Sequence, residues 1–401
     1  MKENLYKKLE QINTYLILNY QKSQGIGALT GISGIALFHF HYSRLVKNKE
    51  IENHAFELIK QCVDEINKGF ESLLFPNGIA GFGWVLDQLE DDNFTVSPCD
   101  NLLADLDQII FNDTISNFQK GEYDFLSGAI GQTLYFVKRY NNTKSKMLKK
   151  RYESYLESII FHLKSGYENG KNYPWESIID KDTNQKGCNL SISHGVSGII
   201  IIITKLNKIK KFEGRLNLII KNSINFLIQQ QKENKLVSIF PNFITNKLET
   251  DGISRLGWCY GDLGVLMAIW YGSKSIKASN EMFFAKEMLL QSCTRRTDEE
   301  TLIVDSGLCH GAFGVAQIYL RMAKEMNLDK LNAVAEFWID QGMKMSSEID
   351  LNNGGFLQWH GKEQGWVNKI NLLEGTAGIG LTIIDLLTKQ KSNWDQCLLI
   401  N

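Results

Sequence analysis

The chain has 401 residues, of which 43% are hydrophobic and 22% are charged, so it is long and apolar enough to bury a substantial core. Lysine and arginine number 44 against 45 aspartates and glutamates, and the net charge of -1 gives no bias toward nucleic acid or anionic lipid. The N-terminal segment is charged throughout, unlike a secretion signal, and no apolar run approaches the ~20 residues that span a bilayer. These features predict a soluble, cytoplasmic protein.

Two kinds of helical segment alternate along the chain. Apolar residues at helical spacing, with a polar opposite face, occur near 5–20, 55–70, 100–118, 150–164, 213–230, 282–292 and 332–345. Between these segments stand Gly-x-x-Gly pairs, at 31/34, 78/81, 128/131, 195/198, 261/264, 311/314 and 375/378. Each pair leads into an apolar run with little polar face, which is typical of a helix buried on all sides.

This sevenfold repeat predicts an all-α fold, an (α/α) toroid in which seven inner helices are wrapped by seven outer helices. No linker rich in proline, serine or charge divides the chain, so we expect one domain over residues 1–401. None of the four prolines falls inside a proposed inner helix. The segments 166–190 and 231–254 enlarge two of the repeats and could line the mouth of the toroid.

The residue before each first glycine should lie at the same level of one rim, because the repeats are equivalent. These residues are Thr30, Asn77, Ser127, His194, Tyr260, His310 and Glu374. One position earlier stand Cys259 and Cys309. The repeat therefore predicts that thiols, imidazoles, a phenol and a carboxylate converge.

Cys259, Cys309 and His310 are predicted to be the ligands of one zinc ion. Seven cysteines, scattered and odd in number, argue for reduced thiols in a chain without an export signal. Three protein ligands leave a fourth position for water or substrate, as in catalytic zinc sites. The alternative is a buried thiol beside a hydrogen-bonded histidine, and Cys188, six residues before His194, is a rival ligand.

The other candidates each have a structural alternative. His194 is a candidate for proton transfer or a structural histidine. Asp124 could cap a helix start or orient a histidine. Arg255 could be a solvated cation and Tyr260 a packing residue. For Glu374 the structural interpretation is preferred, since a carboxylate is stabilised at a helix N-terminus.

Together these positions resemble the lanthionine synthetase C-like (LanC) family, the cyclases that close thioether rings in lantibiotic precursor peptides. The resemblance covers essentially the whole chain, and the residues that carry it are Tyr123-Asp124, Ser193-His194-Gly195, Arg255 followed by Trp258-Cys259-Tyr260-Gly261, and Cys309-His310-Gly311. It implies a toroid with zinc at Cys259, Cys309 and His310. Members of the family can also carry a small extra lobe, which residues 166–190 and 231–254 could form. It also implies that His194, Asp124, Arg255 and Tyr260 belong to the active site.

The resemblance implies a zinc-dependent lanthipeptide cyclase, in which a cysteine thiolate of the substrate adds to dehydroalanine or dehydrobutyrine. His194 is then the candidate acid for the resulting enolate and Asp124 its orienting partner. Arg255 would stabilise the enolate oxygen, with Tyr260 as a hydrogen-bonding neighbour. The expected partners are the dehydrated precursor and, by family analogy, a dehydratase and an ABC transporter that would bring the protein to the membrane.

Other functions remain open at this point. A LanC-like enzyme could add glutathione to dehydroamino acids, and a silent toroid could bind a peptide as a scaffold, although a scaffold needs no open zinc site. A glycosidase or a prenyltransferase subunit shares the architecture. Glycosidases need a pair of carboxylates, whereas this rim offers only Asp124 and Glu374, and the thiols would be surplus.

Overall fold

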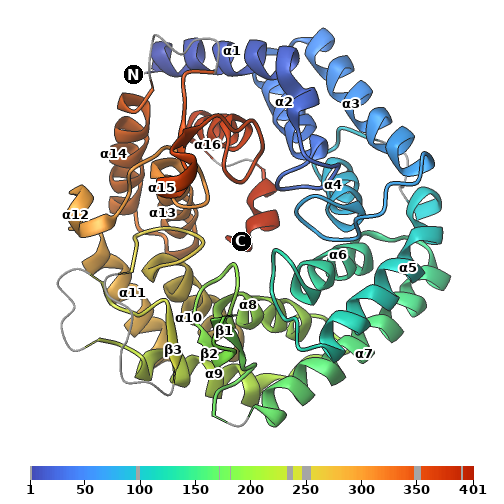
Figure 1. The fold of residues 1–401 in the computed structure, drawn as a ribbon, viewed down its shortest axis with the longest axis vertical. Helices are drawn as coiled ribbons and strands as arrows, with labels where there is room; N and C mark the ends of the chain where they lie inside the picture. The colour runs from blue at the N-terminus through green and yellow to red at the C-terminus, as the bar shows by residue number, and fades with distance from the viewer. Residues whose placement is uncertain are drawn as a thin grey trace. The chain divides into compact units, whose positions relative to one another are not determined.

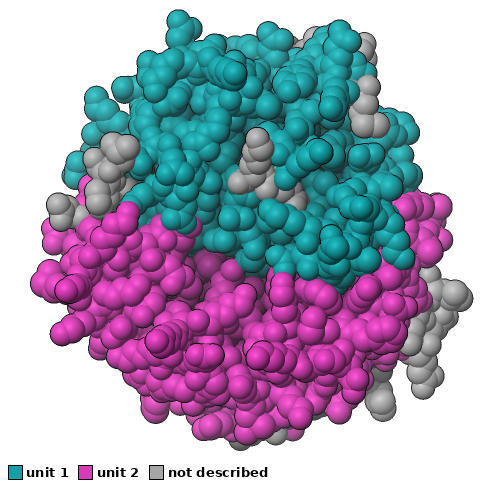
Figure 2. Space-filling model, turned by 180° about the vertical axis from the view of Figure 1, so that it is seen from behind, with its two compact units in different colours: residues 1–98, 303–401 teal, residues 99–302 magenta. Residues whose placement is uncertain are grey.

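The computed structural model describes residues 2–95, 100–170, 172–180, 182–232, 238–245, 254–346, 354–389 and 392–401. This part of the chain forms sixteen α-helices and five short strands (Figure 1). It divides into two compact units. Unit 1 joins both ends of the chain, Met1–Pro98 and Ile303–Asn401, and unit 2 is the central part, Cys99–Leu302 (Figure 2). The single domain over 1–401 stays a prediction.

Seven amphipathic helices lie within a few residues of the predicted segments. They are α1 (Lys2–Asn19), α3 (Lys49–Asn67), α5 (Asp100–Gln119), α7 (Lys146–Asn169), α9 (Asn217–Gln229), α11 (Ser279–Ser292) and α14 (Lys330–Lys344). In α3 the Asn48 side chain accepts hydrogen bonds from the first turn, and the helix buries Ile51, Ala55, Leu58 and Cys62 on one face. That face packs against the preceding helix, α2 (Ile32–Val46).

Seven buried helices alternate with the amphipathic ones, as the glycine repeat predicts. They are α2, α4 (Ile79–Asp91), α6 (Ala129–Asn142), α8 (Val196–Asn207), α10 (Asp262–Ile276), α13 (Ala312–Met326) and α16 (Thr376–Thr388). The first glycine of every pair is the N-cap residue of its helix. In α8 every residue except Lys205 is buried. The prediction of helices without a solvent face is confirmed.

Several glycines of these pairs lie very close to the loop that precedes the helix. A Cβ added to Gly81 would lie 1.8 Å from the Phe75 carbonyl oxygen, and one added to Gly195 would lie 1.9 Å from that of Asn189. In each case the carbonyl belongs to the residue six positions earlier. The loop therefore folds back under the helix start, so closely that only glycine leaves room for it.

Loops of neighbouring repeats are hydrogen-bonded to one another within each unit. In unit 1 the Cys309 N–H donates to the Leu373 carbonyl at 2.8 Å, and the Leu373 N–H donates to the Leu29 carbonyl at 2.9 Å. In unit 2 the Ser193 hydroxyl donates to the Cys259 carbonyl at 2.9 Å. Within each unit, the residues just before the buried helices thus lie side by side.

The two segments that enlarge the repeats contribute a small antiparallel sheet. Its strands are β1 (Ser177–Asp180), β2 (Gln185–Asn189) and β3 (Phe243–Thr245), in the order β1-β2-β3, with Cys188 opposite Ile244. Residues 233–237 and 246–253, which belong to the second predicted segment, lie outside the described residues. The predicted extra lobe therefore corresponds, in the described part, to this sheet.

The remaining elements are short. The helix α12 (Asp298–Thr301) is the last helix of unit 2 along the chain. In unit 1 the strands β4 (Gln358–Trp359) and β5 (Trp366–Val367) flank α15 (Gly361–Gln364). Two 3₁₀ helices span Tyr20–Lys22 and Trp394–Leu398. Among the described residues, no helix combines the length and the apolar character that crossing a membrane would require.

Candidate functional site

A cavity of about 750 Å³ in unit 2 collects several of the predicted site residues. Asp124, Ser127, His194 and Tyr260 line it, and three of these four directly precede a first glycine. Strand residues of β1, β2 and β3 supply another part of the wall. The sheet inserted into the repeat and the loops before the buried helices thus shape one cavity.

His194 and Asp124 form the central pair of this cavity. His194 Nδ1 lies 2.6 Å from Asp124 Oδ2, and the two side chains are 30% and 24% exposed. The other oxygen, Asp124 Oδ1, accepts hydrogen bonds from the backbone N–H groups of Leu126 and Ser127 at 2.7 and 2.8 Å. The carboxylate therefore does both things that the sequence left open: it stabilises the turn before α6 and it orients the histidine.

The pKa of His194 lies above its ordinary value as the result of opposing influences. Burial lowers the pKa of the imidazole. The hydrogen bond to Asp124, the charge of that carboxylate and the neighbouring Cys259 together raise the pKa by more than burial lowers it. Because Nδ1 faces Asp124, Nε2 is the nitrogen that can exchange a proton with a bound molecule. His194 thus has the geometry of an oriented acid–base group.

Tyr260 lies next to this pair. Its ring centroid is 5.4 Å from that of His194, and its hydroxyl accepts a hydrogen bond from Asn189 Nδ2 at 3.3 Å. Arg255, by contrast, is not among the residues that line the cavity. Its buried Nε has no hydrogen-bond partner within the described residues. The structure brings Tyr260, His194 and Asp124 together in this cavity.

The loop that carries Cys259 and Tyr260 is held by the start of α10. Gly261 has a φ of 134°, which favours glycine, and a Cβ there would lie 1.8 Å from the Arg255 carbonyl oxygen. The next residue, Asp262, is fully buried, pairs with Arg295 and accepts the Ile239 N–H at 3.0 Å. These contacts fix the backbone on both sides of Cys259.

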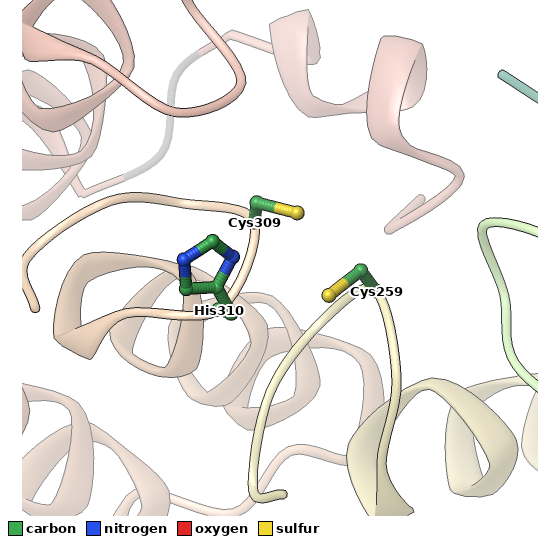
Figure 3. Close-up of side chains that lie close together, drawn as sticks. All are labelled: Cys259, Cys309 and His310. Atoms are coloured by element: carbon green, nitrogen blue, oxygen red, sulfur yellow. The ribbon is translucent and has the colours of Figure 1, made fainter. Parts of the chain in front are cut away.

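Cys259, Cys309 and His310 form a group that can hold a metal ion. One ligand atom from each residue lies within 4.8 Å of the others, and Figure 3 shows the three side chains close together. In a tetrahedral zinc site, bonds of about 2.3 Å to sulfur and about 2.0 Å to nitrogen place the ligand atoms roughly 3.5–3.8 Å apart. The limit of 4.8 Å is compatible with this geometry, and thiolate with imidazole is a donor set that suits zinc.

The rival thiol, Cys188, is placed differently. It is a fully buried residue of β2, and its Sγ lies 3.7 Å from the Pro174 carbonyl oxygen. Burial holds the pKa of this thiol far above its usual range. Cys188 therefore packs as a small apolar residue and is not part of the metal-binding group.

Two carboxylates of unit 1, Asp305 and Glu374, each lie close to a histidine. Asp305 was not among the candidates from the sequence. Asp305 Oδ2 lies 3.0 Å from His310 Nε2, and this carboxylate is almost completely buried. Glu374 directly precedes Gly375, and its Oε1 lies 3.4 Å from Nε2 of His360. His360 was not among the candidates from the sequence either. Asp305 stands six residues before Gly311, where the repeat alignment also places Asn189 before Gly195. That alignment is a signal that could have placed Asp305 in the loop before α13, but it does not pair the carboxylate with His310.

Comparison with known proteins identifies the relatives of this chain. Residues 23–399 match the family described as lanthionine synthetase C-like protein. The chain is 23% identical over 398 residues to nisin biosynthesis protein NisC of Lactococcus lactis subsp. lactis, which covers 92% of this chain and 88% of that protein. A solved structure of nisin cyclase is similar with a TM-score of 0.77 and 18% identity, over 99% of this chain and 98% of that one. The expected fold class, an all-α toroid, is confirmed by this likeness.

Proposed function

The chain belongs to the lanthionine synthetase C-like family, and we propose that it is a zinc-dependent lanthipeptide cyclase. The proposed reaction joins a cysteine thiol of a dehydrated precursor peptide to the β-carbon of a dehydroalanine or dehydrobutyrine residue. Similarity to a nisin biosynthesis protein and to a nisin cyclase supports this class of reaction. The observation that carries the proposal is the group of Cys259, Cys309 and His310.

In this proposal Cys259, Cys309 and His310 hold the zinc ion and leave one coordination position for the substrate. When bound, zinc would deprotonate a thiol whose pKa is otherwise about 8.5. Two protein thiolates reduce the net charge at the site, which keeps the substrate sulfur nucleophilic. The donor set therefore suits activation of a thiol.

His194 and Asp124 supply the proton transfer. Attack of the sulfur forms a C–S bond, opens the C=C bond and leaves an enolate whose α-carbon must be protonated. Protonated His194 is placed to donate the proton on its Nε2 to that carbon, and the proton that the thiol releases to solvent replaces it, so no other reactant is consumed. Asp124, 2.6 Å from Nδ1, orients the ring and stabilises its charged form.

The lining of the cavity suits a peptide substrate. Apolar side chains of the sheet, Ile178, Ile179 and Phe243, share the wall with His194 and Tyr260. In the proposed site Tyr260 positions the reacting segment, and Arg255, which precedes Cys259 in the same loop, stabilises the enolate oxygen. A dehydratase and an ABC transporter are proposed as partners by family analogy alone.

The reaction is tested with a dehydrated precursor peptide and the purified protein. Ring closure leaves the peptide mass unchanged while removing free thiols, which alkylation followed by mass spectrometry counts. Addition of glutathione would instead raise the mass of the product, and a scaffold would change neither quantity. Thiols that persist at the level of a protein-free control would contradict the cyclase proposal.

Replacement of a ligand tests the metal site. Cys309→Ala is expected to abolish stoichiometric zinc binding and cyclisation, because it removes one of three ligands. Cys293→Ala is the matched control, since this cysteine ends α11 and is outside the metal-binding group. Metal analysis of the purified proteins provides the readout. Equal zinc in Cys309→Ala and in wild type would refute the ligand assignment.

A further inference from the structure

Asp305 makes contacts that a simple packing residue would not need. Its side chain is 0% exposed, and its Oδ2 lies 3.0 Å from His310 Nε2 and 3.1 Å from the backbone nitrogen of Trp359. Its Oδ1 accepts the Gly307 N–H at 3.0 Å. Both backbone partners are donors, and burial without donors would be costly for a carboxylate. Asp305 is therefore built to accept a proton-bearing nitrogen from His310 as well.

The neighbouring glycine belongs to the same arrangement. A Cβ on Gly311 would lie 2.3 Å from Asp305 Oδ1. Any larger residue after His310 would thus push the carboxylate away from its place. The glycine that follows Cys309 and His310 serves this contact in addition to starting α13.

The carboxylate contact decides which nitrogen of His310 can bind a metal. A carboxylate accepts and cannot donate, so a neutral imidazole at this distance carries its proton on Nε2. Nδ1 then presents its lone pair. Figure 3 shows the His310 ring with one nitrogen on the side of the two sulfur atoms and the other facing away. The contact with Asp305 and the position of the thiols agree on the same orientation of the ring.

We propose that Asp305 is a positioning residue of the metal site, which holds the proton of His310 on Nε2 and presents Nδ1 to the metal. This inference rests on the zinc site proposed above. Carboxylate partners of this kind fix the tautomer and ring orientation of metal-binding histidines, and their loss typically weakens metal affinity about 10–100-fold. Nothing in the local sequence around His310 marks Asp305 as such a partner.

Asp305→Asn is the sharpest variant because it keeps the size of the side chain. An amide has one accepting oxygen, so it cannot serve the Gly307 N–H, the Trp359 N–H and His310 in the same way. An NH₂ group facing His310 would favour a lone pair on Nε2 and the proton on Nδ1, where it blocks the metal. Asp385→Asn is the matched control, since Asp385 is equally buried in unit 1 but bonds Gln317 and Trp394.

Two measurements test the proposal. Zinc affinity by competition with a chelator should fall about 10–100-fold in Asp305→Asn and stay at the wild-type value in Asp385→Asn. Nitrogen NMR of the metal-free wild type, with His310 assigned by its loss in His310→Ala, should show the Nε2–H tautomer at a pH well above about 6.5. The second measurement needs no Asp305 variant to fold.

The outcomes separate this inference from the zinc proposal. Wild-type affinity in Asp305→Asn, or an Nδ1–H tautomer in the wild type, would overturn the role of Asp305 and leave the zinc site standing. A wild-type protein that takes up no zinc would overturn the zinc site and this inference with it. Weakened binding in Asp305→Asn together with the Nε2–H tautomer supports both.

Discussion

The His194 imidazole combines burial, which disfavours its charge, with a carboxylate that favours it. The carboxylate contact is short, and the net result is a raised pKa. An imidazole of this kind remains protonated at a higher pH than an exposed one and can still act as an acid there. If His194 protonates the enolate, this acid function is present below the raised pKa and is lost as the pH rises through it.

Asp124→Asn should therefore lower the pKa of His194. Without the carboxylate, Cys259 is the one remaining named influence that raises this pKa against the lowering effect of burial. We expect the alkaline limb of the pH profile of kcat/KM to move to lower pH, and the NMR titration of His194 to move with it. Glu122→Gln, another residue of the cavity wall, is the control and should leave both curves in place. An unchanged His194 titration in Asp124→Asn would show that the carboxylate does not set this pKa.

Removal of the imidazole itself tests proton transfer separately from metal binding. His194→Asn keeps an N–H group that can reach Asp124 but cannot carry a proton between two atoms. We expect kcat for cyclisation to fall by about 10²–10⁴, as is typical when a general acid or base is lost, with zinc content unchanged. Loss of zinc in this variant, or a wild-type kcat, would contradict the proposal that His194 transfers the proton and takes no part in metal binding.

At the scale of the element, the glycine pairs explain what could be predicted from the sequence. A glycine pair at a fixed spacing stands at the start of each buried helix, so the starts of all seven helices are visible in the sequence. The metal-binding group follows from the same alignment, since Cys259 and Cys309 occupy equivalent positions. Both features are local, and local features are what a single sequence reveals.

Contacts between distant segments could not be predicted in this way. Asp305 receives the Trp359 N–H across 54 residues, and β2 pairs with β3 across a helix pair. Neither contact has a periodic signature. The interval lengths showed that residues 166–190 and 231–254 were surplus to the repeat, but the pairing of β2 with β3 depends on tertiary contacts.

The second glycine of a pair can be tested by its contact distance. A Cβ on Gly314 would lie 1.9 Å from the Leu308 carbonyl oxygen, whereas at the equivalent Gly264 the nearest atoms are 3.1 Å away. Gly314→Ala must therefore displace the loop that carries Cys309 and His310. We expect a loss of about 1–3 kcal/mol in the free energy of unfolding, together with weaker zinc binding.

Gly264→Ala is the matched control because its neighbours need to give way by only a few tenths of an ångström. Urea unfolding of both variants, followed by circular dichroism, provides the comparison. The explanation of the glycine pair would be wrong if Gly314→Ala were as stable as Gly264→Ala.

At the scale of the whole chain, unit 1 depends on segments from both termini. The Leu373 N–H donates to the Leu29 carbonyl at 2.9 Å, and Lys8 Nζ donates to Ser346 Oγ at 2.7 Å. The last residues return to the same unit, where Asp395 accepts Arg321 Nη2 at 2.7 Å and Nε at 2.9 Å. The loop with Cys309 and His310 therefore belongs to a unit that is built from both terminal parts of the chain.

The ion pair of Arg321 and Asp395 joins the C-terminal segment to the rest of unit 1, and its contribution to stability can be measured. The two side chains are 2% and 0% exposed, so removal of one charge leaves the other buried with too few partners. Such a loss costs about 3–5 kcal/mol, whereas apolar replacement of both partners is often neutral. We expect Arg321→Met to lower the free energy of unfolding by about 3–5 kcal/mol and Arg321→Met with Asp395→Leu to recover much of it.

The control for these two variants is the exposed ion pair of Arg215 and Glu157, whose side chains are 39% and 46% exposed. Arg215→Met should change the free energy of unfolding by no more than about 1 kcal/mol, because solvent screens an exposed pair. Urea unfolding of the four proteins, with zinc content measured in each, links stability to the metal site. If Arg321→Met unfolded like Arg215→Met, the C-terminal segment would not hold unit 1 together through this pair, and zinc binding should then be independent of it.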